Sequence, residues 1–191
     1  MHRAYPRVST AEAVAKAVAD LDAAPFSLRG AGPDDAATVL GLLDDAVVWL
    51  NSRGITEQWG TTSFSGDPKR VDAAAGWVRS GGAVIAECDG LPAGALVVGE
   101  ATSYVSAATE PELYVVLLVA GRDPSARGVG HRLLALADRA ARELGVSLIR
   151  VDCYAGGDQS LVRFYESAGY TRTHTFDVNG WPGQVLERRL D

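Results

Sequence analysis

Residues 125–130 read Ser-Ala-Arg-Gly-Val-Gly, and they stand between an apolar run at residues 113–120 and an amphipathic segment at residues 133–144. A strand, a short loop with glycines and a helix N-terminus gather several free backbone N–H groups at one point. The helix dipole also favours negative charge there. This order of elements predicts an anion-binding loop.

Two common nucleotide-binding patterns do not fit this loop. A P-loop needs Gly-Lys-Ser/Thr at the helix start, whereas Gly130 is followed by His131 and Arg132. A dinucleotide-binding fingerprint follows the first strand of its domain, whereas this loop comes late in the chain. A Gly-x-Gly pair alone is weak evidence, since such a pair before a helix is more often a turn than a ligand site.

Two blocks of the sequence together resemble the GNAT superfamily of acyl-CoA-dependent N-acyltransferases. The first is residues 125–130, which are similar to the family motif Gln/Arg-x-x-Gly-x-Gly/Ala between the fourth strand and the next helix. Ser125 departs from the motif, and Arg127 or Arg122 can supply the missing positive charge. The second is residues 158–170, which are similar to Asn-x-x-Ala-x-x-x-Tyr-x-x-x-Gly-Phe, with Asp158 in place of Asn and Tyr170 in place of Phe. Their shared order and spacing make the resemblance specific, and it covers roughly residues 26–191.

The resemblance implies acetyl-CoA as co-substrate, and the lack of a P-loop lysine and hydroxyl after Gly130 leads us to expect no metal. The loop amides would hold the coenzyme pyrophosphate, and the pantetheine arm would run along the apolar strand. Asp158 would contact the coenzyme or only cap a helix. The residues so implied in coenzyme binding are Leu118, Val119, Ala120, Ser125, Ala126, Arg127, Gly128, Val129, Gly130, His131 and Asp158.

Transfer of an acyl group to an amine also needs a proton for the leaving thiolate and a base for the amine. The resemblance implies Tyr165 as general acid, although a buried core tyrosine would show the same pattern. Many relatives use a carboxylate on the fourth strand as base, yet residues 114–120 contain no acid. Glu112 at the strand entrance and Glu100 remain, although residues in such positions are more often solvated surface charges.

The segment at residues 49–66 corresponds to the wall of the family's acceptor pocket, so Trp49, Gln58 and Trp59 are candidate substrate-binding residues. The tryptophans are also consistent with core anchors. Two aromatic rings beside a carboxylate would suit an ammonium group on an apolar body. We expect an N-acetyltransferase acting directly, in a ternary complex, on a primary amine of a small molecule or antibiotic rather than of a protein. The alternative is a catalytically degenerate acyl-CoA-binding sensor.

The composition is that of one globular domain, with 191 residues, 47% hydrophobic and 22% charged. A net charge of −6 argues against nucleic-acid binding. No apolar run is long enough for a membrane span or a signal peptide, so we expect a cytoplasmic protein without a membrane partner. Cys88 and Cys153 are interpreted as reduced structural thiols, because nothing nearby in sequence would activate Cys153 as a nucleophile.

The expected fold is α/β (α+β), the GNAT fold: a mixed sheet splayed between its fourth and fifth core strands, with helices on both faces. A helical extension at residues 1–25 precedes the acetyltransferase domain at residues 26–191. Its helix at residues 10–23, capped by Ser9 or Thr10, would pack on the core or form a homodimer contact. Further strands are expected at residues 26–29, 83–88, 91–100, 113–120, 146–154, 170–177 and 184–190. Helices are expected between Asp34 and Gly54, at residues 69–79 and at residues 159–168. Another is expected over the amphipathic segment at residues 133–144, with Gly145 as its stop.

Overall fold

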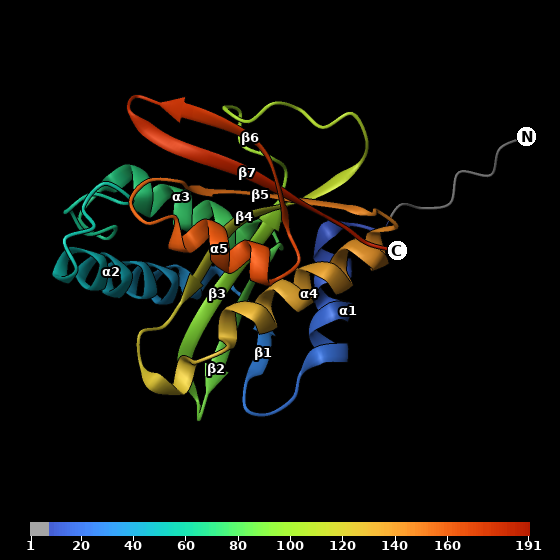
Figure 1. The fold of residues 1–191 in the computed structure, drawn as a ribbon. Helices are drawn as coiled ribbons and strands as arrows, with labels where there is room; N and C mark the ends of the chain where they lie inside the picture. The colour runs from blue at the N-terminus through green and yellow to red at the C-terminus, as the bar shows by residue number, and fades with distance from the viewer. Residues whose placement is uncertain (1–7) are drawn as a thin grey trace, which may run out of the picture.

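A computed structural model describes residues 8–191, so the first seven residues of the expected extension lie outside it. Helices and strands follow one another in the order expected from the sequence (Figure 1). The helices are α1 (Thr10–Leu21), α2 (Ala36–Ser52), α3 (Pro68–Arg79), α4 (Val129–Leu144) and α5 (Ser160–Ser167). The strands are β1 (Ser27–Gly30), β2 (Ala83–Cys88), β3 (Leu91–Gly99), β4 (Glu112–Ala120), β5 (Leu148–Tyr154), β6 (Thr171–Val178) and β7 (Trp181–Arg189).

The seven strands form one sheet in the order β1-β2-β3-β4-β5-β7-β6. Neighbouring strands are antiparallel except β4 and β5, which are parallel. Helices α1, α4 and α5 cover one face of the sheet, and α2 and α3 cover the other (Figure 1). The expected mixed sheet with helices on both faces is thereby confirmed. No helix within residues 8–191 has the length and apolar character needed to cross a bilayer.

Strands β4 and β5 separate partway along their length. Their pairing runs from Glu112 and Leu148 to Val115 and Val151 and ends there, although both strands continue. On its other edge, β4 carries an extra residue at Val116, because Val97 pairs with Leu117 while Val98 pairs with Val115. Such a bulge bends a strand and increases its local twist. The expected splay between the fourth and fifth core strands is therefore present, and the bulge lies beside it.

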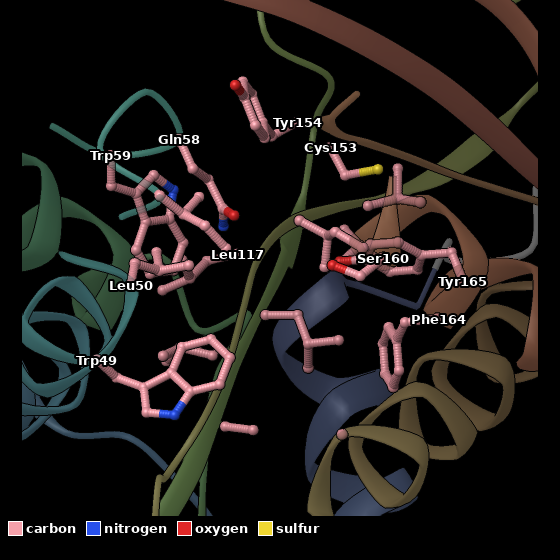
Figure 2. Close-up of a pocket in the computed structure, with 18 of the residues that line it drawn as sticks. Trp49, Leu50, Gln58, Trp59, Leu117, Cys153, Tyr154, Ser160, Phe164 and Tyr165 are labelled. Atoms are coloured by element: carbon pink, nitrogen blue, oxygen red, sulfur yellow. The ribbon is translucent and has the colours of Figure 1, made fainter. Parts of the chain in front are cut away.

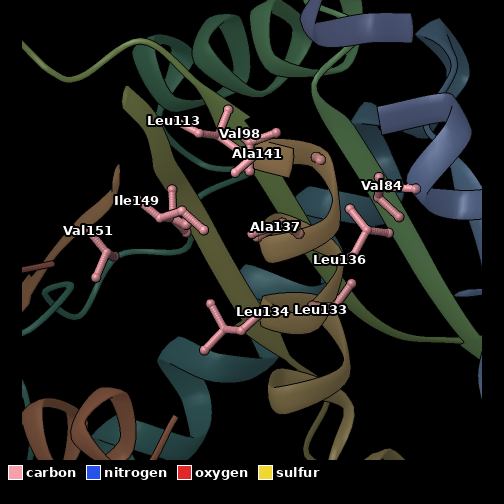
Figure 3. Packing of buried hydrophobic residues seen from close by; sticks show 14 of the residues in the cluster. Val84, Val98, Leu113, Leu133, Leu134, Leu136, Ala137, Ala141, Ile149 and Val151 are labelled. Carbon is pink, nitrogen blue, oxygen red and sulfur yellow. The ribbon is translucent and has the colours of Figure 1, made fainter. Parts of the chain in front are cut away.

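The main core lies between the sheet and α4 (Figure 3). One face of α4 carries apolar residues at helical spacing, and Leu133, Leu136 and Ala137 on it are fully buried. Complete burial of a leucine contributes about 2 kcal/mol. Small side chains along the same face bring the helix close to β4 and β5. The sheet therefore fixes the position of the α4 N-terminus, where the glycine loop ends.

Helix α1 packs against α4. Ser9 is its N-cap and forms a capping box with Glu12, which decides between the two expected caps. Val14 and Ala17 are buried in the same cluster as the apolar face of α4. The expected helix over residues 10–23 ends at Leu21, whose carbonyl accepts a hydrogen bond from Arg132. The structure thus shows the core role that was one of the two expected for this helix.

The C-terminal strand pair differs from expectation. Its second strand begins at Trp181 instead of residue 184, because Asn179 and Gly180 form a two-residue hairpin turn with φ angles of 53° and 83°. Positive φ at both central positions is typical of Asn-Gly in type I′ turns. The three added residues extend the hairpin, and they bring the Trp181 side chain to the pocket described below.

The packing of α1 predicts a stability effect. Val14→Ala should lower the free energy of unfolding by about 2 kcal/mol, because two buried methyl groups are lost and a cavity remains. Val48→Ala is the matched control, since Val48 is an exposed helical valine, and it should change stability by less than about 0.5 kcal/mol. Urea titration of both variants tests this. Equal stability of the two would mean that α1 does not contribute to the core in solution.

Candidate active site

A pocket of about 710 Å³ opens where β4 and β5 separate. Its walls come from the segment around residues 49–59, the second half of β4, the loop that leads to α4, the end of β5 and the start of α5. Most of the residues singled out in the sequence line it, although they come from distant parts of the chain. They are Trp49, Gln58, Trp59, Leu118, Val119, Ala120, Ala126, Arg127, Gly128, Gly130, His131, Asp158 and Tyr165.

The glycine loop is built to approach an anion at one end of this pocket. Gly128 is the N-cap of α4 with φ 91°, and no side chain caps the helix there. The first amide of α4 that donates a hydrogen bond within the helix is that of Arg132, which donates to the Gly128 carbonyl at 3.2 Å. The amides of residues 129–131 precede it and have no intrahelical partner. A Cβ on Gly128 would meet nothing within 4 Å, so the backbone is open to a ligand on that side.

Gly130 has a different role. A Cβ there would lie 2.9 Å from the Phe164 ring, so this glycine permits α4 and α5 to pack closely. His131 lies at the same contact, with its ring edge-on to Phe164 and its Nε2 3.2 Å from the Ser167 hydroxyl.

Two residues of the motif do not bring their side chains into the pocket. The hydroxyl of Ser125 donates to Asp123 at 2.7 Å, and Val129 is fully buried in the core. Arg132 is held by the carbonyl at the end of α1. Arg127 lines the pocket, so it is the cation that the motif itself contributes there.

Trp49 also lies near the glycine loop. The guanidinium carbons of Arg53 and Arg122 lie 4.4 and 4.3 Å from its ring centroid. Burial and the charge of Arg53 lower the pKa of Arg122. Within residues 8–191, no carboxylate forms an ion pair with either guanidinium. We call Trp49 with the loop at residues 121–131 the basic end of the pocket.

Tyr165 lines the pocket and is 4% exposed. Burial raises the pKa of its hydroxyl well above the usual range, so the group stays protonated and can donate. Cys153 lies beside it in Figure 2. Burial, with the nearby Asp152, raises the pKa of that thiol to about 12, and a thiol that is not ionised is a poor nucleophile. The arrangement therefore offers a proton donor and not a thiolate.

Asp158 stands at the start of α5 and is exposed. Its carboxylate accepts a hydrogen bond of 2.9 Å from the Ser160 amide, and this bond lowers the pKa of the carboxyl group. The N-cap of α5 is Gln159, which makes no side-chain capping bond, so the expected cap at Asp158 is wrong: its bond goes to the first helical amide instead. The residue also lines the pocket.

Glu112 is not among the residues that line the pocket. It precedes the point where β4 and β5 separate, and both of its oxygens are engaged by Arg150, at 2.5 and 2.8 Å. Arg150 is 5% exposed and also donates to the Ser106 carbonyl at 2.9 Å. The candidate base from the sequence is therefore corrected. Glu112 holds Arg150, which bonds the loop at residues 101–111, and Glu112 does not line the pocket.

Sequence reasoning missed Asp152. It is the first residue of β5 beyond the last pair with β4, and it lines the pocket. Its carboxylate accepts hydrogen bonds from the hydroxyls of Tyr114 and, at 3.4 Å, Tyr104. Burial raises the pKa of this carboxyl group, and the two hydrogen bonds oppose that rise in part. A charged residue in a largely apolar central strand was the signal that could have found it.

Aromatic side chains surround Asp152 at this end of the pocket. Tyr104, Tyr154 and Trp181 line it together with Gln58 and Trp59. The Trp181 indole donates to the Gln58 carbonyl at 2.8 Å and packs on Tyr154 with ring centroids 5.6 Å apart. Figure 2 shows Gln58 and Trp59 toward Tyr154, with Trp49 farther along the pocket. We call these five residues with Asp152 the aromatic end.

The backbone around Trp59 is held from two helices. Asp44 of α2 accepts hydrogen bonds from the amides of Phe64, at 2.5 Å, and Ser65, at 3.2 Å. Arg70 of α3 donates to the Trp59 carbonyl at 3.1 Å. The irregular segment is thereby fixed as a wall of the pocket.

Comparisons with known proteins agree with this architecture. The sequence model of the acetyltransferase (GNAT) family matches residues 47–170, more than half of the chain. No curated protein sequence matches it. Similar solved structures include a GNAT-family acetyltransferase from Listeria monocytogenes, with 22% identity, a TM-score of 0.65, and coverage of 86% of this chain and 95% of that one.

Two further structures share the fold. The yncA protein from Salmonella typhimurium, solved with its cofactor acetyl-CoA, has 17% identity and a TM-score of 0.60, over 87% of this chain and 95% of that one. An agmatine N-acetyltransferase in its apo form has 15% identity and a TM-score of 0.63, over 87% of this chain and the whole of that one. Because the family match includes the glycine loop, the separated strands and the Tyr165 block that together form the pocket, the chain belongs to the acetyltransferase (GNAT) family.

Proposed function

We propose that this protein transfers an acetyl group from acetyl-CoA to the primary amine of a small molecule within a ternary complex. The observation that carries the proposal is the separation of β4 from β5 beyond Val115 and Val151, directly beside the uncapped N-terminus of α4. Within one pocket, the strand edge is free to bind amides and the helix end is free to bind phosphates.

The residues present fit the coenzyme. The free amides at residues 129–131 and the Arg127 side chain would hold the pyrophosphate, and Arg53 and Arg122 add positive charge nearby. The edge of β4 at Leu118–Ala120 has no β5 partner, so its backbone groups can bond the amides of the pantetheine arm. The yncA protein, which shares this fold, was solved with its cofactor acetyl-CoA, and this supports acetyl-CoA as the co-substrate.

Bound acetyl-CoA supplies an activated thioester. Tyr165 would give its proton to the departing sulfur, which its protonated state allows. The pocket holds the two reactants together, which lowers the entropic part of the barrier.

The competing function is that of a degenerate acyl-CoA-binding sensor. The sequence favoured this alternative because residues 114–120 of the fourth strand contain no carboxylate that could act as the base. Asp152 places a carboxylate in the pocket from the neighbouring strand instead. Together with Tyr165, this carboxylate favours the enzyme.

Loss of the Arg127 charge should weaken coenzyme binding. Arg127→Ala is expected to raise the acetyl-CoA dissociation constant about tenfold or more, the scale of a lost hydrogen bond to a charged group. Arg79→Ala is the matched control, because Arg79 is an exposed arginine outside the pocket. Calorimetric titration of both folded variants provides the measurement, and equal affinity for the two would contradict the proposed pyrophosphate contact.

Loss of the Tyr165 hydroxyl should slow turnover. Tyr165→Phe is expected to lower kcat about 100-fold while leaving acetyl-CoA affinity unchanged. Tyr170→Phe is a close control: Tyr170 is a buried tyrosine next to Tyr165, its hydroxyl has no hydrogen-bond partner in the described structure, and it does not line the pocket. It should keep full activity. Steady-state kinetics decide the matter, and equal turnover of the two variants would make Tyr165 a packing residue only.

A further inference from the structure

The two ends of the pocket differ in charge. Arg122, Asp123, Arg127 and His131 all belong to the basic end, and Asp158 stands exposed at the start of α5. Among the described residues of the aromatic end, Asp152 is the one with a charge. Glu57 also raises the pKa of Tyr154, but it is exposed and outside the lining of the pocket. Within the lining of this end, a ligand group therefore meets one carboxylate and several aromatic rings.

No basic side chain neutralises Asp152 in the described structure. Arg150, two residues earlier on β5, points its guanidinium at Glu112 and the Ser106 carbonyl. The partners of Asp152 are the neutral hydroxyls of Tyr114 from β4 and Tyr104 from the loop at residues 101–111. These hydroxyls orient the carboxylate and leave acceptor capacity on both of its oxygens. A partly buried carboxylate without a cation is costly, and a bound ammonium would remove that cost.

Aromatic rings form much of the wall at this end of the pocket. Tyr104 and Trp181 both pack on Phe176, with ring centroids 5.4 and 6.0 Å away, and Tyr154 continues the wall. Trp59 lies on the opposite wall, in the segment at residues 49–66. The Trp181 indole holds this segment through its hydrogen bond to the Gln58 carbonyl. Such walls accept an aromatic ring in stacked or edge-on contact.

We propose that the acceptor is a small monoamine with an aromatic body and no carboxylate beside its amine, and that Asp152 binds its ammonium group and takes its proton. The proposal rests on the proposed function and adds the substrate class and the base. A carboxylate next to the amine would face Asp152 with no cation to offset it. A second ammonium would lose water among aromatic walls whose lining residues include no second carboxylate.

The proton balance closes with these residues. Asp152 takes one proton from the ammonium, which frees the nitrogen lone pair to form the amide C–N bond as the thioester C–S bond breaks. Tyr165 gives its proton to the leaving sulfur and regains one from the amide nitrogen. Asp152 then releases its proton to water, so one proton leaves per turnover.

Three probe amines test the substrate class: 2-phenylethylamine, phenylalanine and putrescine, each assayed by thiol release from acetyl-CoA. Phenylalanine adds only a carboxylate to the first probe, and putrescine replaces the ring with a second amine. We expect kcat/KM to be at least about tenfold higher for 2-phenylethylamine than for either other probe. A preference for phenylalanine or putrescine would overturn the inference and leave the proposed function standing.

The role of Asp152 is tested by Asp152→Asn with Asp89→Asn as matched control. Asp89 lies in the turn between β2 and β3, outside the pocket. Asp152→Asn should lower kcat/KM for 2-phenylethylamine about 100-fold, with acetyl-CoA affinity unchanged. The loss should shrink as pH rises, because the amine then deprotonates without help. Burial raises the pKa of the facing hydroxyls of Tyr104 and Tyr114, so neither changes charge near neutral pH.

A second variant keeps the test valid if Asp152→Asn fails to fold. Tyr104 is 50% exposed, so Tyr104→Ala should fold. It should raise KM for 2-phenylethylamine at least about fivefold by removing one aromatic wall, and Tyr104→Phe should raise it less because the ring remains. Unchanged KM in Tyr104→Ala, or wild-type rates in a folded Asp152→Asn, would overturn the inference. Absence of acetyl-CoA binding by the wild-type protein would instead overturn the proposed function.

Discussion

The end of hydrogen bonding between β4 and β5 is the constraint on which the site depends. Up to Val115 and Val151 the strands satisfy each other's backbone groups, and beyond these residues the facing edges have no partner in the sheet. Buried backbone groups need a partner, so a wedge between strands is suited to an extended ligand that carries amides. Each functional group is placed relative to this point: the glycine loop follows β4, Asp152 comes next on β5, and α5 brings Tyr165 alongside.

The ion pair between Glu112 and Arg150 supports the site without entering it. A partly buried pair of this kind is weak evidence for added stability, because desolvation offsets much of the attraction. Its geometric effect is clearer. Arg150 also bonds the Ser106 carbonyl, and this contact holds the loop that carries Tyr104 against the sheet. Glu112, which the sequence suggested as a base, therefore affects the pocket only indirectly. It holds Arg150, and Arg150 holds the loop that carries Tyr104.

Opposite charges at the two ends of one pocket would orient two different ligands. Arg53, Arg122 and Arg127 gather positive charge around Trp49 and the glycine loop, whereas the aromatic end holds the carboxylate of Asp152. A polyanionic coenzyme and a cationic amine are each favoured at one end and disfavoured at the other. Under the proposed function, their reactive groups would meet in the middle of the pocket, where the strands separate and Tyr165 lies.

The order of the elements, the glycine loop, the amphipathic face of α4 and the Tyr165 block could all be predicted from the sequence, because each depends on residues close together in the chain. The Asn179-Gly180 pair is also a recognisable turn signal in the sequence. Because it was not used, the start of β7 was predicted three residues too late. The fold was needed to show which carboxylate faces the pocket, since Glu112 and Asp152 lie on neighbouring strands and differ in their position relative to the last β4–β5 pair. It likewise separated Trp49 from Trp59 and joined Gln58 to Trp181 across 123 residues. Strand register and long-range loop contacts arise from packing of the whole sheet, and local patterns of residue type do not encode them.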